Sequence, residues 1–262
     1  MRTVRILRVL IARELTTTLT YRWWLLFLQL ATVISPAISL LVWRGAIAQG
    51  ATPPVTESFL TTYLVMVGLV VMLTASWTSG FMAESIRLGK LTSWLVRPCS
   101  THLANIANNL GEKLIKLLLA VPLAVGLGII FRDQVKLPSS PGRWLAFAIA
   151  LTLAGGMAYT LDVVIGSLAF WFEDVTAVNR LRFLVSGLLS GAIIPLALFP
   201  SAFAGFLAIQ PFRFMVSFPL EVLLGHPTAG SFAWQAGWSA TFLGAAILTW
   251  RLGLRSYQGA GA

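Results

Sequence analysis

Charged residues are the scarcest class in this chain of 262 residues. They make up 11% of it, whereas a soluble domain carries about 25%. A soluble fold needs charge over its whole surface, but a surface that faces lipid needs none. We therefore predict one membrane domain over residues 1–262, with no separate soluble domain. The net charge of +10 does not indicate nucleic-acid binding, because the basic residues flank apolar runs instead of forming a patch on a polar domain.

The residues and motifs of common catalytic and metal sites are also missing. A single cysteine, Cys99, excludes an internal disulfide, and His102 and His226 alone argue against a histidine-based metal site. The sequence contains no H-E-x-x-H, no G-x-x-x-x-G-K-[ST] and no G-x-S-x-G. We therefore expect no catalytic residue, metal or cofactor in this chain. Without the phosphate-binding loop, any work driven by ATP needs a partner.

Long apolar runs fill most of the chain, and crossing a bilayer takes about 20 apolar residues in a helix. The runs predict an all-α membrane protein with six transmembrane helices, at about residues 23–43, 58–83, 114–131, 144–172, 183–200 and 230–250. The first run is longer than the apolar part of a signal peptide, and Arg44 separates it from Ala46-Ile47-Ala48, which resembles a cleavage site. We therefore expect that run to be retained.

The basic residues indicate an orientation for these spans. With both termini in the cytoplasm, most of the 19 lysines and arginines lie inside: Arg2, Arg5, Arg8, Arg13, Arg22, Arg87, Lys90, Arg97, Lys113, Lys116, Arg180, Arg182, Arg251 and Arg255. Those left outside are Arg44, Arg132, Lys136, Arg143 and Arg213. Cytoplasmic loops carry the excess of positive charge, so the sequence predicts cytoplasmic termini.

Three segments do not fit simple spans. Residues 1–22 alternate basic and apolar residues at helical spacing, which favours an amphipathic interfacial helix over a basic topology signal with incidental helicity. Residues 84–98 hold large apolar groups among basic ones and end at Pro98, so we expect a short amphipathic helix. That helix either lies on the bilayer or docks into a soluble partner. Prolines in 201–225 predict short re-entrant helices at the outer face.

Two features inside the spans carry alternative interpretations. Asp162, with Tyr159 nearby, is either a substrate or proton contact or a structural group between helices. Its place well past the centre of a long run favours the structural role. Gly187 and Gly191 form G-x-x-x-G in the predicted fifth span, flanked by Ser190. Such small residues allow close helix approach either within the chain or at a subunit interface.

An ordered set of short motifs resembles one family of membrane proteins. Gly89-Lys90-Leu91 is followed by Leu95-Val96-Arg97-Pro98, and Phe170-Trp171 ends the fourth span. Ser190-Gly191 then leads to Ile194-Pro195-Leu196-Ala197-Leu198-Phe199-Pro200, followed by Pro211-Phe212-Arg213, Phe218-Pro219 and Leu224-Gly225. The set is similar to the permease subunits of type-2 ATP-binding-cassette (ABC) exporters, in the six-span group. Thr92 stands where members often have an acidic residue, which leaves an acid-dependent role there in doubt.

The resemblance implies a transport function and its partners. Two ABC ATPase subunits would bind ATP and Mg, and a second permease, a related chain or a copy of this one, would complete the transporter in a prokaryotic inner membrane. The resemblance implies a coupling helix that contacts the ATPase, an interface or pathway role in the fifth span, and outer re-entrant helices. We assign coupling to Arg87, Gly89, Leu91, Trp94, Leu95, Arg97 and Pro98, the interface to Gly187, Ser190, Gly191 and Pro195, and the outer segment to Pro211, Phe212, Arg213 and Pro219.

The expected cargo is amphiphilic, a lipid, drug or peptide, moved out of the cytoplasm. Two other functions remain open. A membrane-embedded lipid or sugar transferase would need converging acid, base or metal residues at one membrane face. A non-transporting anchoring or assembly subunit would bind a partner without transporting a compound.

Overall fold

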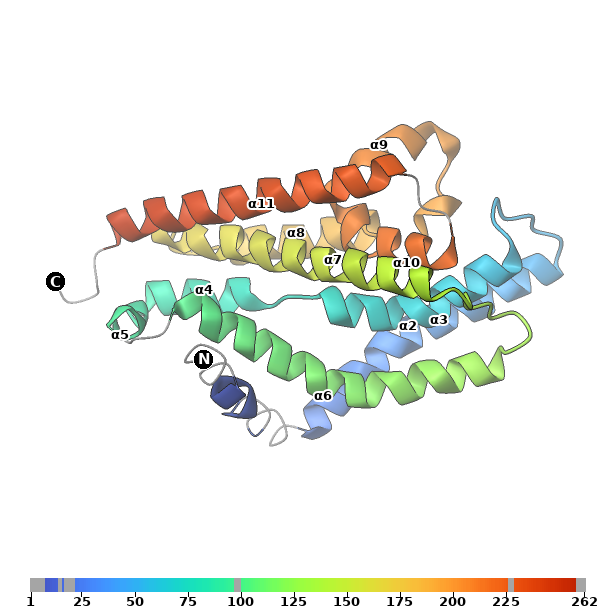
Figure 1. Ribbon diagram of the computed structural model, residues 1–262, viewed down its shortest axis with the longest axis horizontal. Coiled ribbons are helices and arrows are strands. Elements are labelled where there is room, and N and C mark those ends of the chain that lie inside the picture. Colours follow the sequence, from blue (N-terminus) through green and yellow to red (C-terminus); the bar gives the residue numbers. More distant parts are fainter. Residues whose placement is uncertain (1–7, 14–15, 17–21, 97–99, 226–228, 258–262) are drawn as a thin grey trace.

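The chain folds almost wholly into helices. The computed structural model describes residues 8–13, 16, 22–96, 100–225 and 229–257, and no strand occurs among them. This part of the chain confirms the predicted all-α class (Figure 1). The α-helices are α2 Arg22–Ala48, α3 Glu57–Thr74, α4 Thr78–Arg87, α5 Leu91–Leu95, α6 Thr101–Ile130, α7 Pro141–Ser167, α8 Thr176–Leu189, α9 Ala204–Ile209, α10 Ser217–Leu224 and α11 Ala229–Ser256. Short 3-10 helices are η1 Leu168–Phe170, η2 Leu196–Leu198, η3 Ser201–Phe203 and η4 Pro211–Met215.

The central helix of the fold is α7. It packs against α11, α4, α10 and α3, while α3 also contacts α2 and α6. Helix α11 runs beside α7 in the same direction (Figure 1). Helix α5 and the last turns of α7 and α11 lie at one end of the molecule, called here the α5 end. The loops 49–56 and 131–140 lie at the other end, called here the loop end.

Three helical stretches in the described residues are long and apolar enough to cross a membrane. They are Glu57–Arg87, Thr101–Ile130 and Pro141–Phe170, and Ile34–Ala48 is a shorter apolar helix. They overlap the predicted spans 58–83, 114–131 and 144–172 and extend beyond each of them at one or both ends, because polar segments continue the helices outside the apolar runs. The full six-span arrangement stays a prediction.

Two predicted spans are not continuous helices. The span 58–83 is split after Thr74, where residues 75–77 leave the helix before α4 begins. The span 183–200 is wrong as a helix, because α8 begins earlier and ends at Leu189. The first turn of α8 receives a local bond, as the Asp174 carboxylate accepts the Thr176 N–H at 2.8 Å. The hydrogen bonds from Thr176 hold the pKa of Asp174 below its usual range.

The predicted short helices of 201–225 are present as η3, α9, η4 and α10. They lie in the half of the molecule away from α5 (Figure 1). Of the predicted amphipathic helix at 1–22, residues 8–13 and 16 are helical, and most of the rest lies outside the described residues. Position relative to a membrane stays a prediction for both segments.

Two buried apolar clusters hold the helices together. The larger cluster joins α3, α7, η4 and α10, with Tyr63, Met157, Phe214 and Phe218 essentially without exposed surface. The smaller cluster lies at the α5 end and joins α4, α5, α7 and α11. Because lipid is as apolar as these side chains, close packing and polar contacts, not escape from water, decide how such helices associate.

Candidate functional site

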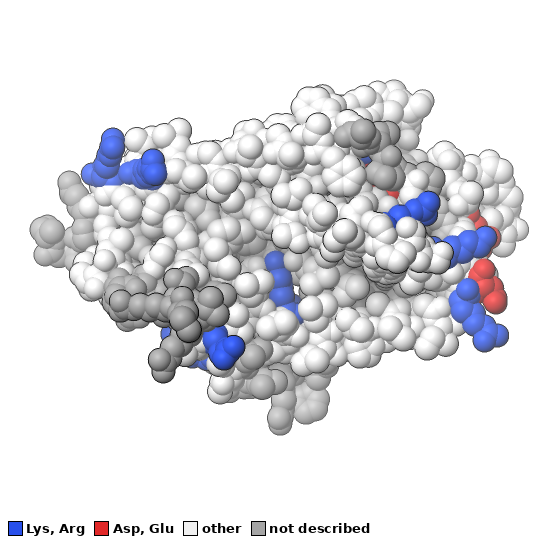
Figure 2. Space-filling view, in the orientation of Figure 1, with Lys and Arg blue, Asp and Glu red and all other residues white. Residues whose placement is uncertain are grey.

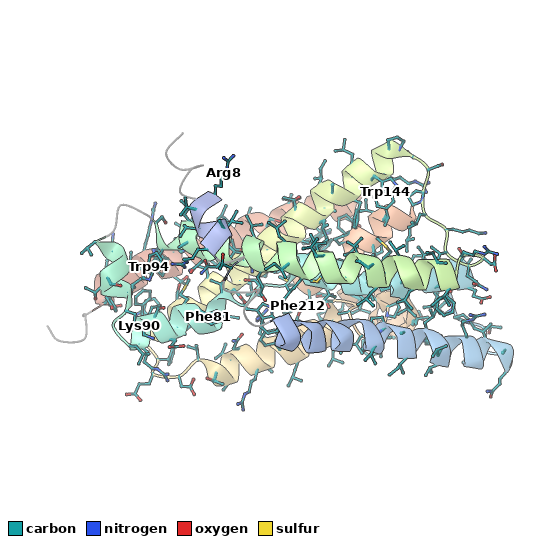
Figure 3. All side chains as sticks on the ribbon, turned by 90° about the horizontal axis from the view of Figure 1, so that it is seen from below. Arg8, Phe81, Lys90, Trp94, Trp144 and Phe212 are labelled. Atoms are coloured by element: carbon teal, nitrogen blue, oxygen red, sulfur yellow. The ribbon has the colours of Figure 1, made fainter. Side chains whose placement is uncertain are left out.

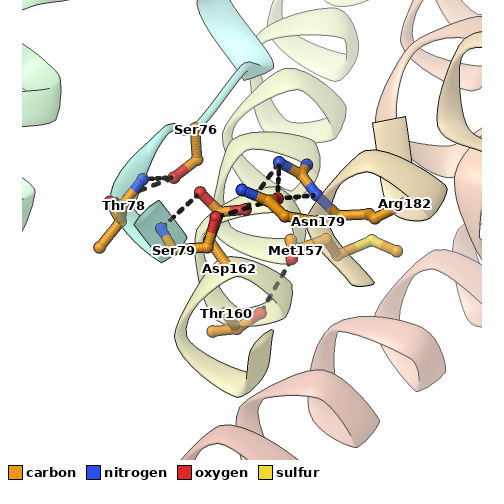
Figure 4. Close-up of polar contacts among 8 residues, drawn as sticks. All are labelled: Ser76, Thr78, Ser79, Met157, Thr160, Asp162, Asn179 and Arg182. Atoms are coloured by element: carbon orange, nitrogen blue, oxygen red, sulfur yellow. Dashed lines mark hydrogen bonds and ion pairs between the residues drawn. The ribbon is translucent and has the colours of Figure 1, made fainter. Parts of the chain in front are cut away.

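The break between α3 and α4 is stabilised by a carboxylate from α7. Asp162 accepts the backbone N–H of Ser79, in the first turn of α4, at 3.2 Å. The first N–H groups of a helix have no partner within it, and a negative charge at that end is favourable. Asp162 therefore caps α4 from another helix. Ser76 adds a local bond, since its hydroxyl donates to the Thr78 hydroxyl at 3.2 Å (Figure 4).

The same carboxylate forms an ion pair with α8. The guanidinium Nη2 of Arg182 lies 3.1 Å from Asp162 Oδ1, and the two side chains are 11% and 0% exposed. Among the described residues, no aligned hydrogen bond reaches Oδ1, so the contact is an ion pair by distance alone. Asn179 links both sides, because its Oδ1 accepts from the Ser79 hydroxyl at 3.2 Å and from Arg182 Nη2 at 3.3 Å (Figure 4).

This group, Ser79, Asp162, Asn179 and Arg182, is called here the polar junction, and it joins α4, α7 and α8. At about 1.5 Å per residue, Asp162 lies about 31 Å along α7 from Pro141, and the break after Thr74 lies about 26 Å from Glu57. The hydrocarbon core of a bilayer is about 30 Å thick. If Glu57 and Pro141 both lie at one membrane boundary, as the predicted spans have it, the junction lies near the other boundary, toward the α5 end.

The contacts of Asp162 support the structural role over the substrate or proton role. The side chain is fully buried, and it connects three helices. Tyr159, named with it from the sequence, faces other residues: its hydroxyl donates to the His102 carbonyl at 3.3 Å, and it packs in the smaller cluster. The two residues are one turn apart on α7 and serve different contacts.

The residues predicted to couple to the ATPase differ in burial around α5. Leu91 is 1% exposed and packs in the smaller cluster against α7 and α11. The prediction that it contacts a partner is therefore corrected: Leu91 anchors α5 to the rest of the chain. Trp94 is half-buried in the same cluster. Arg87 and Leu95 are exposed, and Gly89 turns the chain between α4 and α5 with a φ of +67°. Arg97 and Pro98 lie outside the described residues.

The predicted G-x-x-x-G pair does not form one helix face. Gly191 lies beyond the end of α8 with a φ of +83°, a left-handed conformation that favours glycine. Its carbonyl accepts the Tyr63 hydroxyl at 2.9 Å. Ser190 and Pro195 are buried within the chain as well, so they offer no surface to a second subunit. Gly187 is half-buried, and a side chain there would meet Ile193 of this chain.

The outer segment is joined by a second set of polar contacts. Arg213 pairs with Glu221 at 2.5 Å, with both side chains 15% exposed, and Glu221 also accepts from the Ser217 hydroxyl at 2.8 Å. Pro211 and Phe212 begin η4, where the Phe212 N–H donates to Gln210 at 2.7 Å. Pro219 is buried in the first turn of α10, where a missing N–H costs little. Arg213 thus links η4 to α10 and, through the Ala208 carbonyl, to α9 within the segment, while Phe212 packs against the larger cluster.

Sequence reasoning missed three members of the polar junction. Arg182 counted only as a topology signal, and Ser79 and Asn179 were not considered. Asn179 and Arg182 are three apart on α8, and that spacing places both on one helix face. The sequence did contain one indication of this contact, because Asp162 lies in one predicted span and Arg182 lies at the edge of the next. In the described part of the chain, no cluster of three or more His, Cys, Asp or Glu could hold a metal.

Comparison with known proteins gives one positive finding. A family model described as ABC-2 family transporter protein matches residues 56–261, which covers everything from the N-cap of α3 to beyond the end of α11. A search of curated proteins gives no match.

Proposed function

Because the chain belongs to the ABC-2 transporter family, we propose that it is the membrane-spanning half of an ATP-driven exporter. Membership makes it a multi-pass membrane protein and the permease component of an ABC transporter, which implies an ABC ATPase as partner. Export out of the cytoplasm and two ATPase copies that bind ATP and Mg are parts of the proposal. So is a second permease, either a related chain or another copy. We propose that the cargo is amphiphilic.

The observation that carries the proposal is the arm formed by α4 and α5. Helix α4 packs along α7 and leads at Arg87 into α5. Leu91 anchors α5 in the smaller cluster, while Leu88, Leu95 and Val96 are 51%, 49% and 80% exposed. Apolar side chains exposed at a water-facing end form a site for a soluble partner. This arm is therefore our proposed coupling element for the ATPase.

The α5 end is proposed to face the cytoplasm of a prokaryotic cell. Lys90 and Trp94 lie at that end and Trp144 at the other (Figure 3). Basic residues that the helix bounds place toward the α5 end are Arg87, Lys90, Lys113, Lys116, Arg180, Arg182, Arg251 and Arg255, against Arg44, Arg132, Lys136, Arg143 and Arg213 toward the loop end. The larger number at the α5 end supports this orientation through the excess of positive charge in cytoplasmic loops. Both termini would then be cytoplasmic.

The polar junction supplies a physical route from the arm to the rest of the membrane domain. Asp162 holds the first turn of α4 and the α8 residue Arg182 at once. A displacement of α5 would move α4 as a rigid helix about the break at residues 75–77. The junction would pass that displacement to α7 and α8. ATP binding in the partner would thereby shift the membrane helices between two access states.

Helix α8 is the proposed contact with the second permease. None of its residues is fully buried, and Leu181, Leu184 and Leu188 are 61%, 67% and 55% exposed. Its residues Asn179 and Arg182 join it to α4 and α7 through the polar junction, and Phe183 contacts the Trp77 ring. This assignment keeps the interface on the fifth span but moves it from Gly191, Ser190 and Pro195 to the exposed leucines.

Leu95→Asp is expected to weaken ATPase binding about thirtyfold, the effect of losing an interface contact worth about 2 kcal/mol. A charge would replace an exposed apolar side chain at the tip of the arm. The measurement is the affinity of the purified full chain for its ATPase in detergent. Leu137→Asp is the matched control, because Leu137 is also 49% exposed and lies at the loop end. Equal binding by the two variants would contradict the coupling assignment.

A photo-crosslinking amino acid at position 184 is expected to link the chain to its second permease in membranes. The same group at position 118 is the control, since Leu118 on α6 is 73% exposed and Leu184 on α8 is 67% exposed. Mass spectrometry of the product distinguishes another copy of this chain from a related one. Products of equal yield from both positions, or a product from position 118 alone, would refute the α8 interface.

A further inference from the structure

Helix α6 carries two lysines, Lys113 and Lys116, at the start of its apolar run. The Lys116 ammonium pairs with the Glu112 carboxylate and lies 5.8 Å from the centre of the Trp77 ring. Lys113 is half-buried, and no described residue forms an ion pair or hydrogen bond with its ammonium group. Glu112 and Asp162 interact with Lys113 only at longer range. Each of those carboxylates is already paired, one with Lys116 and one with Arg182.

The depth of Lys113 matches that of the polar junction. At about 1.5 Å per residue, Lys113 lies about 26 Å along α6 from Ile130. A hydrocarbon core about 30 Å thick therefore ends close to Lys113 on the α5 side. Figure 2 shows basic atoms surrounded by uncharged surface near the middle of this face, between the charged groups at its two ends, and Figure 1 shows the break between α3 and α4 at about the same place along the long axis. If Ile130 lies at the opposite membrane boundary, this depth is the level of the lipid phosphates.

The surroundings of Lys113 suit a molecule with an anionic head and apolar chains. Ile106, Leu110 and Leu114 on the same helix are 37%, 42% and 48% exposed. Lys113, Lys116 and Glu112 together leave one positive charge without a partner, which a phosphate diester would balance. A lysine is a compact charge suited to phosphate, and basic sites between membrane helices on the cytoplasmic side bind lipid headgroups.

We propose that Lys113 binds the phosphate of an anionic amphiphile, whose apolar chains lie over the exposed face of α6. Lys116, held between Glu112 and Trp77, adds positive charge beside it. The proposal goes beyond the exporter function by naming the chemistry of a ligand. It requires α6 to cross the membrane but requires no ATPase, so its failure and that of the exporter function are separate results.

The test is binding of phosphatidylglycerol with a fluorescent tail to the purified full chain in a neutral detergent. Unlabelled phosphatidylglycerol is expected to compete, whereas phosphatidylcholine with the same tails and inorganic phosphate are not. Lys113→Met is expected to weaken binding about tenfold, in the range for a charge-assisted hydrogen bond. Lys113→Arg is expected to retain it. The matched control is Lys136→Met, which removes one exposed lysine at the loop end.

Three results would overturn the proposal. Equal competition by phosphatidylcholine would show that the phosphate charge is not recognised. Full competition by inorganic phosphate would show a free-anion site. Unchanged binding by Lys113→Met would exclude this lysine. Melting temperature gives a second readout, because removing an unpaired, half-buried charge is expected to leave the fold as stable or more so, whereas loss of a purely structural lysine would lower the melting temperature.

Discussion

Arg182→Met is expected to lower the free energy of unfolding by about 3–5 kcal/mol, the cost of leaving one partner of a buried ion pair alone. The side chain of Asp162 is 0% exposed, and Arg182 is the basic group within ion-pair distance of it in the described residues. The substitution also removes the bonds from Arg182 to Asn179. The measurement is thermal unfolding of the purified chain in detergent, compared with the unchanged protein.

Two further variants separate charge from packing. Arg180→Met is the matched control, because Arg180 lies two residues earlier on α8 and is exposed, so a small change is expected. The double variant Asp162→Asn and Arg182→Met removes both charges and leaves an oxygen to accept the Ser79 N–H, so most of the lost stability is expected to return. If the double variant is as unstable as Arg182→Met, the unpaired charge is not the cause.

Gly191→Ala is expected to be the next most destabilising substitution. The left-handed backbone there costs a residue with a side chain about 1–2 kcal/mol. The new Cβ would also meet the Tyr63 hydroxyl at 2.5 Å and the Ser217 side chain at 3.1 Å. Tyr63 is 1% exposed and donates to the Gly191 carbonyl, so it cannot move aside without losing that bond. Overpacking of this kind costs about 1–3 kcal/mol.

The control for Gly191→Ala is four residues earlier on α8. At Gly187 the backbone is helical, and an added Cβ would meet only the end of the Ile193 side chain at 3.3 Å. Alanine is favoured over glycine inside a helix by about 1 kcal/mol, so Gly187→Ala is expected to keep or raise the melting temperature. Equal melting temperatures for the two variants would show that neither the left-handed backbone at Gly191 nor the lack of room for a Cβ there limits stability.

Apolar length and proline spacing predicted the parts of the fold that depend on local sequence. The runs around α3, α6 and α7 were long enough to identify as spans, and the prolines of 201–225 correctly predicted the short helices there, whereas the helix predicted to continue to Pro200 ends at Leu189. The end of α8 was also readable, because Ser190-Gly191 is a common helix end with glycine in a left-handed conformation. Gly191 also fits a helix-packing motif with Gly187, and that motif favours a continuous helix through Gly191.

The features that could not be predicted depend on contacts distant in sequence. Nothing in Ala75-Ser76-Trp77 forbids a helix, and the break is stable because Asp162, from another helix, accepts a free N–H of α4. Leu91 has the same apolar pattern as Leu95, yet one is 1% exposed and the other 49%. Only the position of α5 against α7 and α11 decides which of them is anchored. A sequence pattern gives the faces of a helix but not its neighbours.

If the chain pairs with a second permease as proposed, the packing of residues 201–225 has a consequence for a cell that makes the two permeases at different rates. Phe214, Phe218, Leu220 and Leu223 have no exposed surface, so each chain closes its own outer end with its own side chains. A copy inserted before its partner arrives would carry a finished barrier and not half of an open channel. Under that proposal, a chain on its own is expected not to conduct ions, so the membrane potential would survive unequal synthesis of the two permeases.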